Sequence, residues 1–315
     1  MTIMDCRPFL AVGVSFLAAV LISFSRRYPN VRESWSVIAS FIKFGLIISM
    51  VPGVLAGVTY EWTLFQITDT IGFTLRADSA GILFACLAAL LWIPINFYSI
   101  GYMRCNNEHE QTGYFAAFAI CMSSVMGIAM ASNLLTFFFF YELLTIASYP
   151  LVLHKRNEEA LLASRKYLIY TLISGQLFLA GLVAVYCISG TMDFKAGGFL
   201  TTDMAPTWQL QLIFLIMILA GSVKAAVMPL HGWLPAAMIA PTPVSALLHA
   251  VAVVKTGVFA VLRIIGFVFG PKLLADIGTA DILAWFAAGS IIISSLIAIQ
   301  QDNLKRRLAF STIGQ

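Results

Sequence analysis

The sequence predicts an all-α polytopic membrane protein, and three observations support this fold class. Hydrophobic residues make up 60% of the 315 residues and charged residues 11%, whereas a soluble globular chain carries roughly 25% charged residues. The mean hydropathy is +0.90. Long apolar runs recur along the chain, and each approaches the ~20 residues that a helix needs to cross a bilayer. They are too long and too weakly alternating for the strands of a membrane barrel.

The apolar runs predict about nine full spans and the beginning of a tenth helix near Asn303. Their predicted limits, in chain order, are Pro8–Ser25, Ser34–Val58, Ser79–Met103, Thr112–Ala131, Leu134–Leu153, Leu161–Ile188, Trp208–Met228, Pro243–Phe269 and Ile282–Ile299. We expect the first run to be a retained helix rather than a cleaved signal peptide, because its charges, Arg26 and Arg27, follow the apolar stretch.

Basic residues gather in alternate loops, which predicts the orientation because cytoplasmic loops are enriched in them. One side carries Arg26, Arg27, Arg32, Arg104, Lys155, Arg156, Arg165, Lys166, Lys305, Arg306 and Arg307. The other side carries only Arg7, Arg76, Lys195 and Lys272. We therefore place the first group in the cytoplasm and the N-terminus outside an inner (plasma) membrane. The outer loop from Thr59 to Asp78 has a pattern that predicts a small hairpin.

Composition and spacing argue against several classes of ligand. The net charge of +4 comes from short loops and not from one basic block, so nucleic-acid binding has no support. The five cysteines form no CxxC pair, the four histidines lack metal-binding spacing, and the sequence has no glycine-rich phosphate loop. We expect no metal, cofactor or redox centre in this chain.

Five ionisable residues lie inside the predicted spans: Lys43, Glu142, Lys224, Lys255 and Arg263. A charge at the bilayer centre costs ~2.5–3.5 kcal/mol, so each is a functional hypothesis. Glu142 is the acid among them, and its short side chain lies too deep to reach either interface. The alternative for Glu142 is a structural salt bridge. Lys43, which can extend towards an interface, and Arg263, near a helix end, are expected to be structural.

Lys224 lies near the middle of the seventh predicted span, shortly before Pro229, Gly232 and Pro235. These residues predict a break in the helix, which is tolerated at membrane depth only beside protein or a water-filled cavity. Broken helices at the midplane mark ion-binding sites in transporters. The alternative is a simple kink with a lysine that reaches the interface. His231, just after the proline, either exchanges protons at the break or caps the broken helix.

Lys255 lies in the middle of the next span, with His249 on the same helix. The two lie on different helix faces, so water or a hydroxyl such as that of Thr256 would have to bridge them in a relay. His249 is equally well explained as a packing histidine. The proton affinity of a buried lysine depends on whether a carboxylate is near. Separation of Glu142 from Lys224 would therefore drive a proton from Lys224 towards Lys255.

Two stretches resemble the proton-conducting antiporter-like subunits of respiratory complex I, the NADH:quinone oxidoreductase. They are NLLTFFFFYELLTIASYPLV, at 133–152, and KAAVMPLHGWLPAAMIAPTPVSALLHAVAVVKTGVFAVLR, at 224–263. The resemblance is specific because it joins an intramembrane glutamate, a broken helix and a lysine helix in this order. Related subunits occur in Mrp-type cation/proton antiporters, membrane-bound hydrogenases and inorganic-carbon uptake systems.

The resemblance implies three N-terminal helices at 1–111 and a first five-helix repeat, inverted relative to the second, at 112–270. Residues 271–315 would begin the second repeat, and KRRLAFSTIGQ resembles its start. We expect a fragment or truncated gene rather than a split gene. The resemblance also implies that Glu142 pairs with Lys224 and that Lys255 with His249 carries the proton onward. Thr242 and Ser245 would hold water beside them.

The resemblance implies a proton-translocating membrane subunit of a redox-driven complex I type NADH–quinone oxidoreductase or related hydrogenase. Such a protein works with other membrane subunits in the lipid bilayer, moves protons or sodium ions, and contains no redox centre of its own. The alternative is a subunit of an Mrp-type antiporter or of an inorganic-carbon uptake complex. A second alternative is a structural remnant without transport activity.

Overall fold

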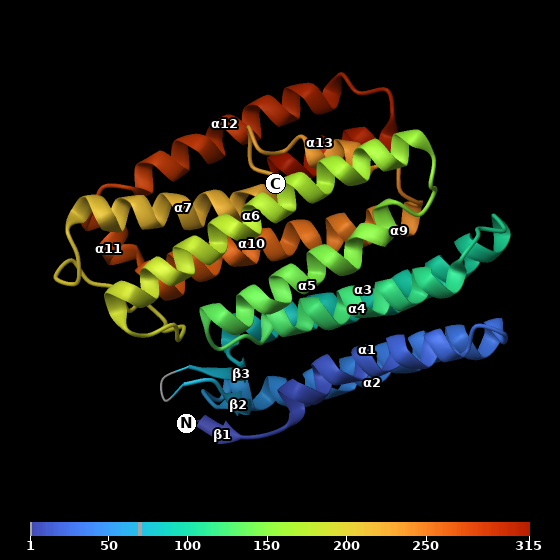
Figure 1. Ribbon diagram of the computed structural model, residues 1–315, viewed down its shortest axis with the longest axis horizontal. Helices are drawn as coiled ribbons and strands as arrows, with labels where there is room; N and C mark the ends of the chain where they lie inside the picture. Colours follow the sequence, from blue (N-terminus) through green and yellow to red (C-terminus); the bar gives the residue numbers. More distant parts are fainter. Residues whose placement is uncertain (1, 69–70) are drawn as a thin grey trace.

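The computed structural model describes residues 2–68 and 71–315, except for the side chains of residues 248–250. Long helices lie side by side between two ends of the molecule (Figure 1). Within the described residues, eight helices are long and apolar enough to cross a membrane: α1 (Arg7–Phe24), α2 (Pro29–Leu55), α3 (Ser79–Cys105), α4 (Gln111–Ala129), α5 (Leu134–Val152), α6 (Glu158–Ser189), α7 (Thr207–Ala225) and α12 (Ala280–Ile299). The predicted class, a polytopic α-helical membrane protein, is confirmed.

Short polar side chains begin three of these helices, because their oxygens accept hydrogen bonds from backbone N–H groups that have no partner within the helix. Asp78 accepts from Gly81 N at the start of α3. Asn157 does the same for Ala160 N at the start of α6. Asn133 accepts from Thr136 N at the start of α5 and donates to Gly72 O. The caps of α3 and α5 agree with the predicted starts at Ser79 and Leu134, whereas α6 begins at Glu158, before the predicted Leu161.

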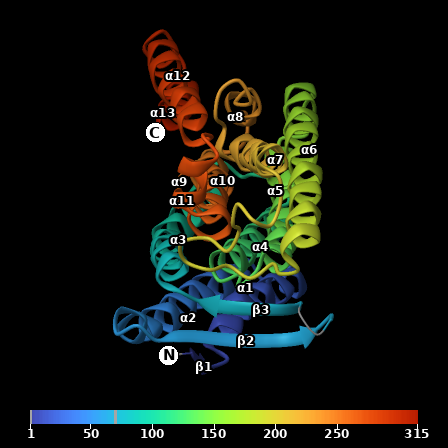
Figure 2. The ribbon, with the colours of Figure 1, turned by 90° about the vertical axis from the view of Figure 1, so that its left-hand side faces the viewer.

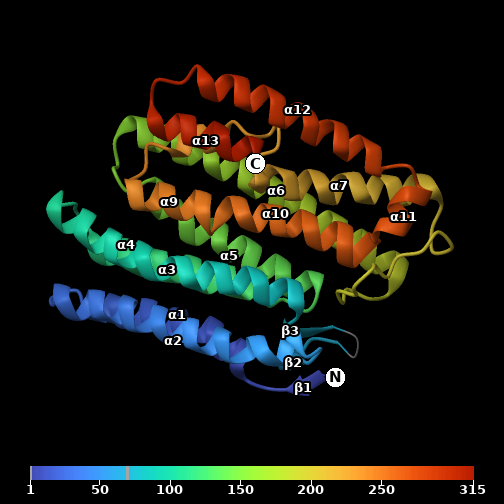
Figure 3. The same ribbon diagram turned by 180° about the vertical axis from the view of Figure 1, so that it is seen from behind.

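The predicted single helix Pro243–Phe269 is wrong. The structure has α9 (Thr242–Ala250), α10 (Val253–Arg263) and a π-helix, η1 (Ile264–Phe269). α9 and α10 follow each other along one line (Figure 3). Between them, Val251 (φ −133°, ψ −51°) and Ala252 (φ −90°, ψ −85°) leave helical geometry. Neither is Pro or Gly, so the sequence contained no local signal for this break.

Three further helices are short: α8 (Trp233–Ala237), α11 (Pro271–Asp276) and α13 (Leu304–Gly314). α8 follows the predicted break after α7, and α13 packs against α8, α9 and α12. The break after α7 and the break between α9 and α10 therefore lie in one half of the molecule, next to α12 and α13 (Figure 1).

The predicted hairpin at Thr59 to Asp78 is confirmed. β2 (Thr59–Gln66) pairs antiparallel with β3 (Gly72–Ala77). β1 (Thr2–Met4), which was not predicted, adds to β2 in parallel. The sheet lies across one end of α1 and α2 (Figure 2). The α1–α2, α3–α4, α5–α6 and α12–α13 connections lie at the opposite end (Figure 1). The loops rich in Lys and Arg therefore share one end, as the charge pattern predicts.

Arg263 connects the end of α10 to the beginning of α3. Its guanidinium, in a residue only 1% exposed, donates to both carboxylate oxygens of Asp78. The rings of Phe194, Phe259 and Phe267 surround it at 4.5–5.1 Å from the guanidinium carbon. Paired with a carboxylate and enclosed by aromatic faces, this cation has the structural role expected from the sequence.

Lys43 points into the protein and does not extend to an interface, which its long side chain would allow. The residue is fully buried, its Nζ donates to Met122 O at 2.9 Å, and Nζ lies 4.5 Å from the centre of the Trp92 ring. The contact joins α2 to α4 and α3. These contacts agree with the structural role expected of Lys43, because a lysine stem can also point inward when a carbonyl and an indole face receive the ammonium.

Replacement of Arg263 tests the buried ion pair. Arg263→Met keeps most of the side-chain volume but leaves the Asp78 carboxylate without its partner. We expect the free energy of unfolding in detergent to fall by about 3 kcal/mol, the cost of breaking a buried pair from one side.

The matched control is Arg156→Met, because Arg156 pairs with Glu110 at the surface with both side chains more than half exposed. Its loss should cost at most about 1 kcal/mol. Equal destabilisation by the two substitutions would contradict a structural role for Arg263.

Candidate functional site

Glu142 extends from the middle of α5 towards α6. Its carboxyl group lies against Gly175: a Cβ added at this glycine would be only 2.2 Å from Oε1. Oε1 is buried and has no hydrogen-bond partner among the described residues. A buried carboxylate oxygen without a donor is costly. We therefore expect the Glu142 carboxyl group to bind a proton, a water molecule or a cation during function.

On its other side, Glu142 borders an apolar cavity of about 640 Å³ between α1, the hairpin and α5. Phe9, Phe65, Phe73 and Phe139 contribute to its lining. These rings offer no hydrogen bond to a carboxylate. Polar partners for Glu142 must therefore come from the α6 and α7 side.

Lys224 occupies the last turn of α7 and is fully buried. Its Nζ donates a hydrogen bond to the carbonyl oxygen of Tyr141, the residue before Glu142. The same Nζ lies 3.3 Å from the centre of the Tyr141 ring. The alternative of a lysine that reaches the interface is wrong, because the side chain stays in the protein interior.

Glu142 and Lys224 are neighbours without direct contact. They form no ion pair in the part of the chain that the structure describes, yet their charges are close enough to interact electrostatically. The ammonium is held by the carbonyl and ring of Tyr141. The pairing that the resemblance implies is thus present as proximity between α5 and α7, with Tyr141 at the contact.

A small hydroxyl network connects the helices around this pair. Ser174 Oγ on α6 donates to Ala220 O at 2.7 Å. The Tyr141 hydroxyl donates to the same carbonyl at 3.2 Å and lies 3.2 Å from Ser174 Oγ. Ala220 is one turn before Lys224 on α7. Sequence reasoning missed Tyr141 and Ser174, although a hydroxyl in an apolar run, adjacent to a buried charge, was a possible signal.

The helix breaks directly after Lys224, as predicted. α7 ends at Ala225, and Ala226 adopts a left-handed conformation (φ +59°). Pro229 and Gly232 lie in the break, whereas Pro235 lies in the first turn of α8, where proline is tolerated. His231 also lies in the break, half-buried, with its ring 6.0 Å from that of Phe310.

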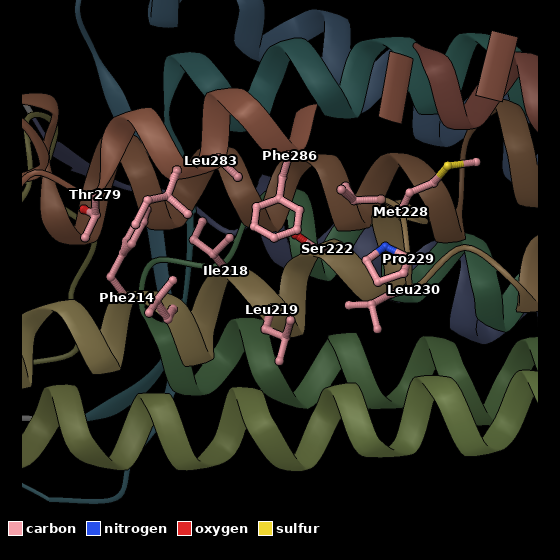
Figure 4. A pocket seen from close by; sticks show the side chains of 13 residues that line it. Phe214, Ile218, Leu219, Ser222, Met228, Pro229, Leu230, Thr279, Leu283 and Phe286 are labelled. Atoms are coloured by element: carbon pink, nitrogen blue, oxygen red, sulfur yellow. The ribbon is translucent and has the colours of Figure 1, made fainter. Parts of the chain in front are cut away.

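Side chains satisfy the backbone groups that the break releases. Trp233 Nε1 donates to Val223 O at 2.7 Å, and Met228 N donates to Ser290 Oγ of α12 at 3.1 Å. Backbone N–H and C=O groups that are free at membrane depth are tolerated where protein groups of this kind form hydrogen bonds with them. A small cavity of about 90 Å³ lies between the break and α12 (Figure 4). Its lining is almost entirely apolar, so we expect it to be dry.

Gly257 brings the lysine helix α10 against the end of α7. A Cβ at Gly257 would lie 2.1 Å from Ala225 N and 2.5 Å from the carbonyl carbon of Lys224. Only a glycine allows the two backbones to approach this closely. Lys255, two residues earlier on α10, is therefore near the Lys224 end of α7 although the sequence separates them.

Lys255 lines a cavity of about 340 Å³ together with Thr242, Ser245 and Lys305. Lys305, on α13, donates to Ala240 O at 2.9 Å. Two lysines and three hydroxyls, the third from Thr312, thus share one space beside the break between α9 and α10. The side chain of His249, the other predicted relay residue, lies outside the described residues.

Taken together, a buried lysine, a neighbouring carboxylate and two discontinuous helices define a polytopic membrane protein with an ionisable site inside the bilayer. A family model described as "NADH:quinone oxidoreductase/Mrp antiporter, TM" matches residues 131–315. The chain belongs to this family, which confirms the resemblance drawn from residues 133–152 and 224–263.

Relatives of two kinds match at similar levels. The chain is 30% identical to an Na(+)/H(+) antiporter subunit of Alkalihalophilus pseudofirmus over 305 residues, covering 95% of this chain and 37% of the relative. It is 31% identical to the NAD(P)H-quinone oxidoreductase chain 5 of a Picosynechococcus species over 284 residues, covering 87% and 41%. The chain spans between a third and a half of the length of such relatives.

Solved structures share the fold. A chain of the archaeal membrane-bound sulfane sulfur reductase aligns with a TM-score of 0.87 at 22% identity, over 98% of this chain and 63% of that one. A chain of the Mrp complex from Dietzia aligns with a TM-score of 0.84 at 22% identity, over 98% and 33%. The overall fold of this chain is therefore shared with chains of at least two membrane-protein complexes of known structure.

The close approach at Gly257 is open to a direct test. In Gly257→Ala the added methyl group would contact the backbone of α7, which cannot rotate away. We expect a loss of roughly 1–3 kcal/mol in the free energy of unfolding, measured in detergent. Gly289→Ala on α12 is the control, because nothing lies within 4 Å of its added Cβ. That variant should be as stable as the original or up to about 1 kcal/mol more stable.

Proposed function

We propose that this protein is an ion-translocating membrane subunit, carrying protons within a larger redox-driven complex of the NADH–quinone oxidoreductase type. The observation that carries the proposal is the arrangement at Tyr141. Its carbonyl holds the buried Lys224 ammonium, while the adjacent Glu142 carboxyl oxygen Oε1 has no partner within the described chain. The family and the names of relatives such as NAD(P)H-quinone oxidoreductase chain 5 support the same function.

The arrangement supplies two positions for the Lys224 ammonium. In the first, which the structure adopts, Nζ donates to a neutral carbonyl and faces an aromatic ring. In the second, it would pair with the Glu142 carboxylate, which stabilises the charged form more strongly. When the ammonium moves away from the carboxylate, the proton affinity of Lys224 therefore falls. Alternation between the two would move the ammonium from the Tyr141 carbonyl to the Glu142 carboxylate.

A proton released by Lys224 has a route towards Lys255. Gly257 places α10 in contact with the Lys224 carbonyl, and Lys255 borders a cavity with Thr242 and Ser245. These hydroxyls can hold water, which would bridge a distance that the side chains do not span. In the transfer, Lys224 loses one proton to water and Lys255 gains one. We retain His249 as a relay residue and His231 as a residue that exchanges protons at the break.

Partners and orientation belong to the same proposal. One aligned solved structure is described as an archaeal respiratory membrane complex and another as the Mrp complex, which supports assembly with other membrane subunits. The end that carries the basic loops would face the cytoplasm, with the N-terminus outside an inner (plasma) membrane. Redox centres would belong to the partner subunits, and this chain would move ions without one of its own.

Neutralisation of either charge tests the proton route. Glu142→Gln and Lys224→Met keep the side-chain size but remove the ionisable group. In proteoliposomes of the purified complex, we expect proton flux to fall on the order of 100-fold, towards the rate of empty vesicles. Flux is followed with a pH-sensitive dye, and size-exclusion chromatography checks that the complex stays assembled.

The matched control is Glu159→Gln, an exposed carboxylate in the first turn of α6, which should transport at the original rate. Flux at the original rate in the double variant of Glu142 and Lys224 would contradict the proposal. It would instead support the alternative of a structural remnant, in which buried charges merely connect helices.

A second candidate function is that of a component of an Mrp-type cation/proton antiporter. It is favoured by the 30% identity to an Na(+)/H(+) antiporter subunit and by the TM-score of 0.84 to a chain of an Mrp complex. Purification from the native membrane in mild detergent distinguishes the two. We expect iron–sulfur or flavin subunits to accompany the protein; their absence, with other membrane subunits retained, would favour the antiporter.

A further inference from the structure

A cluster of three potential metal ligands lies away from the charged site, at the end of the molecule opposite the sheet. Glu108 and His109 belong to the connection between α3 and α4, and His154 follows the end of α5. Each side chain contributes one ligand atom, and these atoms all lie within 4.8 Å of one another. Two imidazoles and one carboxylate form a ligand set that open zinc sites use.

One of the distances between ligand atoms is close to that of a tetrahedral site. Zinc bound at ~2.0–2.1 Å by each ligand places the ligand atoms about 3.3–3.4 Å apart. His154 Nε2 is already 3.5 Å from Glu108 Oε2. The rings of His109 and His154 are stacked, with centroids 4.8 Å apart and planes 18° from parallel. His109 is exposed, so rotation of its side chain can complete the approach.

His154 provides an independent indication of a missing partner. Its side chain is only 5% exposed, and its Nε2 is buried without a hydrogen-bond partner among the residues that the structure describes. Buried polar atoms are nearly always satisfied, and an exception calls for an explanation such as an unseen ion. The unsatisfied atom is the same one that lies 3.5 Å from the Glu108 carboxylate.

The surroundings can accept a cation. Arg156, which lines the adjacent cavity, already pairs with Glu110, so its charge is compensated. That cavity has a volume of about 150 Å³ and is lined in part by His154 and Tyr114. It leaves space for a water molecule as a fourth ligand. Lys155, next to His154 in the chain, is exposed and can point away.

We propose that Glu108, His109 and His154 bind a divalent transition-metal ion, with Zn²⁺ as the best match. Three protein ligands leave the fourth position open to water, as in zinc sites that exchange ligands. The ion connects the α3–α4 connection to the end of α5, the helix that carries Glu142. The absence of metal-binding spacing in the sequence is compatible with this site, because its ligands come from two separate loops.

Binding of Zn²⁺ alone tests the proposal. The protein, purified in detergent without a polyhistidine tag, is stripped with chelator and dialysed against Zn²⁺ near neutral pH. We expect one Zn²⁺ per chain, measured by elemental analysis. His109→Ala should weaken binding at least tenfold, and His154→Gln should abolish it. Because His109 is exposed, its replacement does not disturb the fold.

Two matched controls separate this cluster from unspecific binding. Glu158→Gln removes an exposed carboxylate at the same end of the molecule, and His231→Gln removes a histidine from the helix break. Both should retain the original affinity and stoichiometry. Less than one Zn²⁺ per chain in the unmodified protein, or unchanged binding in His109→Ala and His154→Gln, would overturn the proposal. Neither result depends on ion flux, so the proposed function is tested separately.

Discussion

The hydrogen bond from Lys224 to the carbonyl of Tyr141 organises the centre of this structure. A fully buried ammonium cannot remain without acceptors, because an uncompensated charge in a low-dielectric interior is too costly. The last turn of α7 therefore packs where its lysine reaches the Tyr141 carbonyl of α5. The hydroxyls of Tyr141 and Ser174, which contact the carbonyl of Ala220, hold α5, α6 and α7 in the same arrangement. Glu142 faces Gly175 as a consequence.

The two helix breaks follow from the same requirement. A charged site inside the bilayer needs polar neighbours, and interrupted helices provide free carbonyls and space for water. Here the interruptions are stabilised by side chains of other segments. At the break after α7, Trp233 donates to Val223 O, and Ser290 of α12 accepts from Met228 N. An apolar cavity lies between the break after α7 and α12, whereas the cavity beside the break between α9 and α10 contains the side chains of Lys255, Thr242 and Ser245.

Much of this could be predicted because burying charge has a known cost. Glu142, Lys224 and Lys255 were identified from their depth in apolar runs, and the break after Lys224 from Pro229 and Gly232. The break at Val251 was missed because no proline or glycine marks it and tertiary packing imposes it. The inward direction of Lys43 was missed for a related reason: its acceptor, Met122 O, belongs to another helix.

By itself, the sequence determined that the chain crosses a membrane, where most of its long helices lie and which end carries the basic loops. It also identified the ionisable residues that are costly to bury in hydrocarbon. These properties depend on local composition, because each residue is transferred between water and hydrocarbon with its own free energy. Only the tertiary structure decided which atoms meet. It placed the Lys224 ammonium on Tyr141 O, the Glu142 carboxyl on Gly175, and His154 beside Glu108. Contacts between helices depend on how side chains from distant parts of the chain pack together, and local composition does not specify this packing.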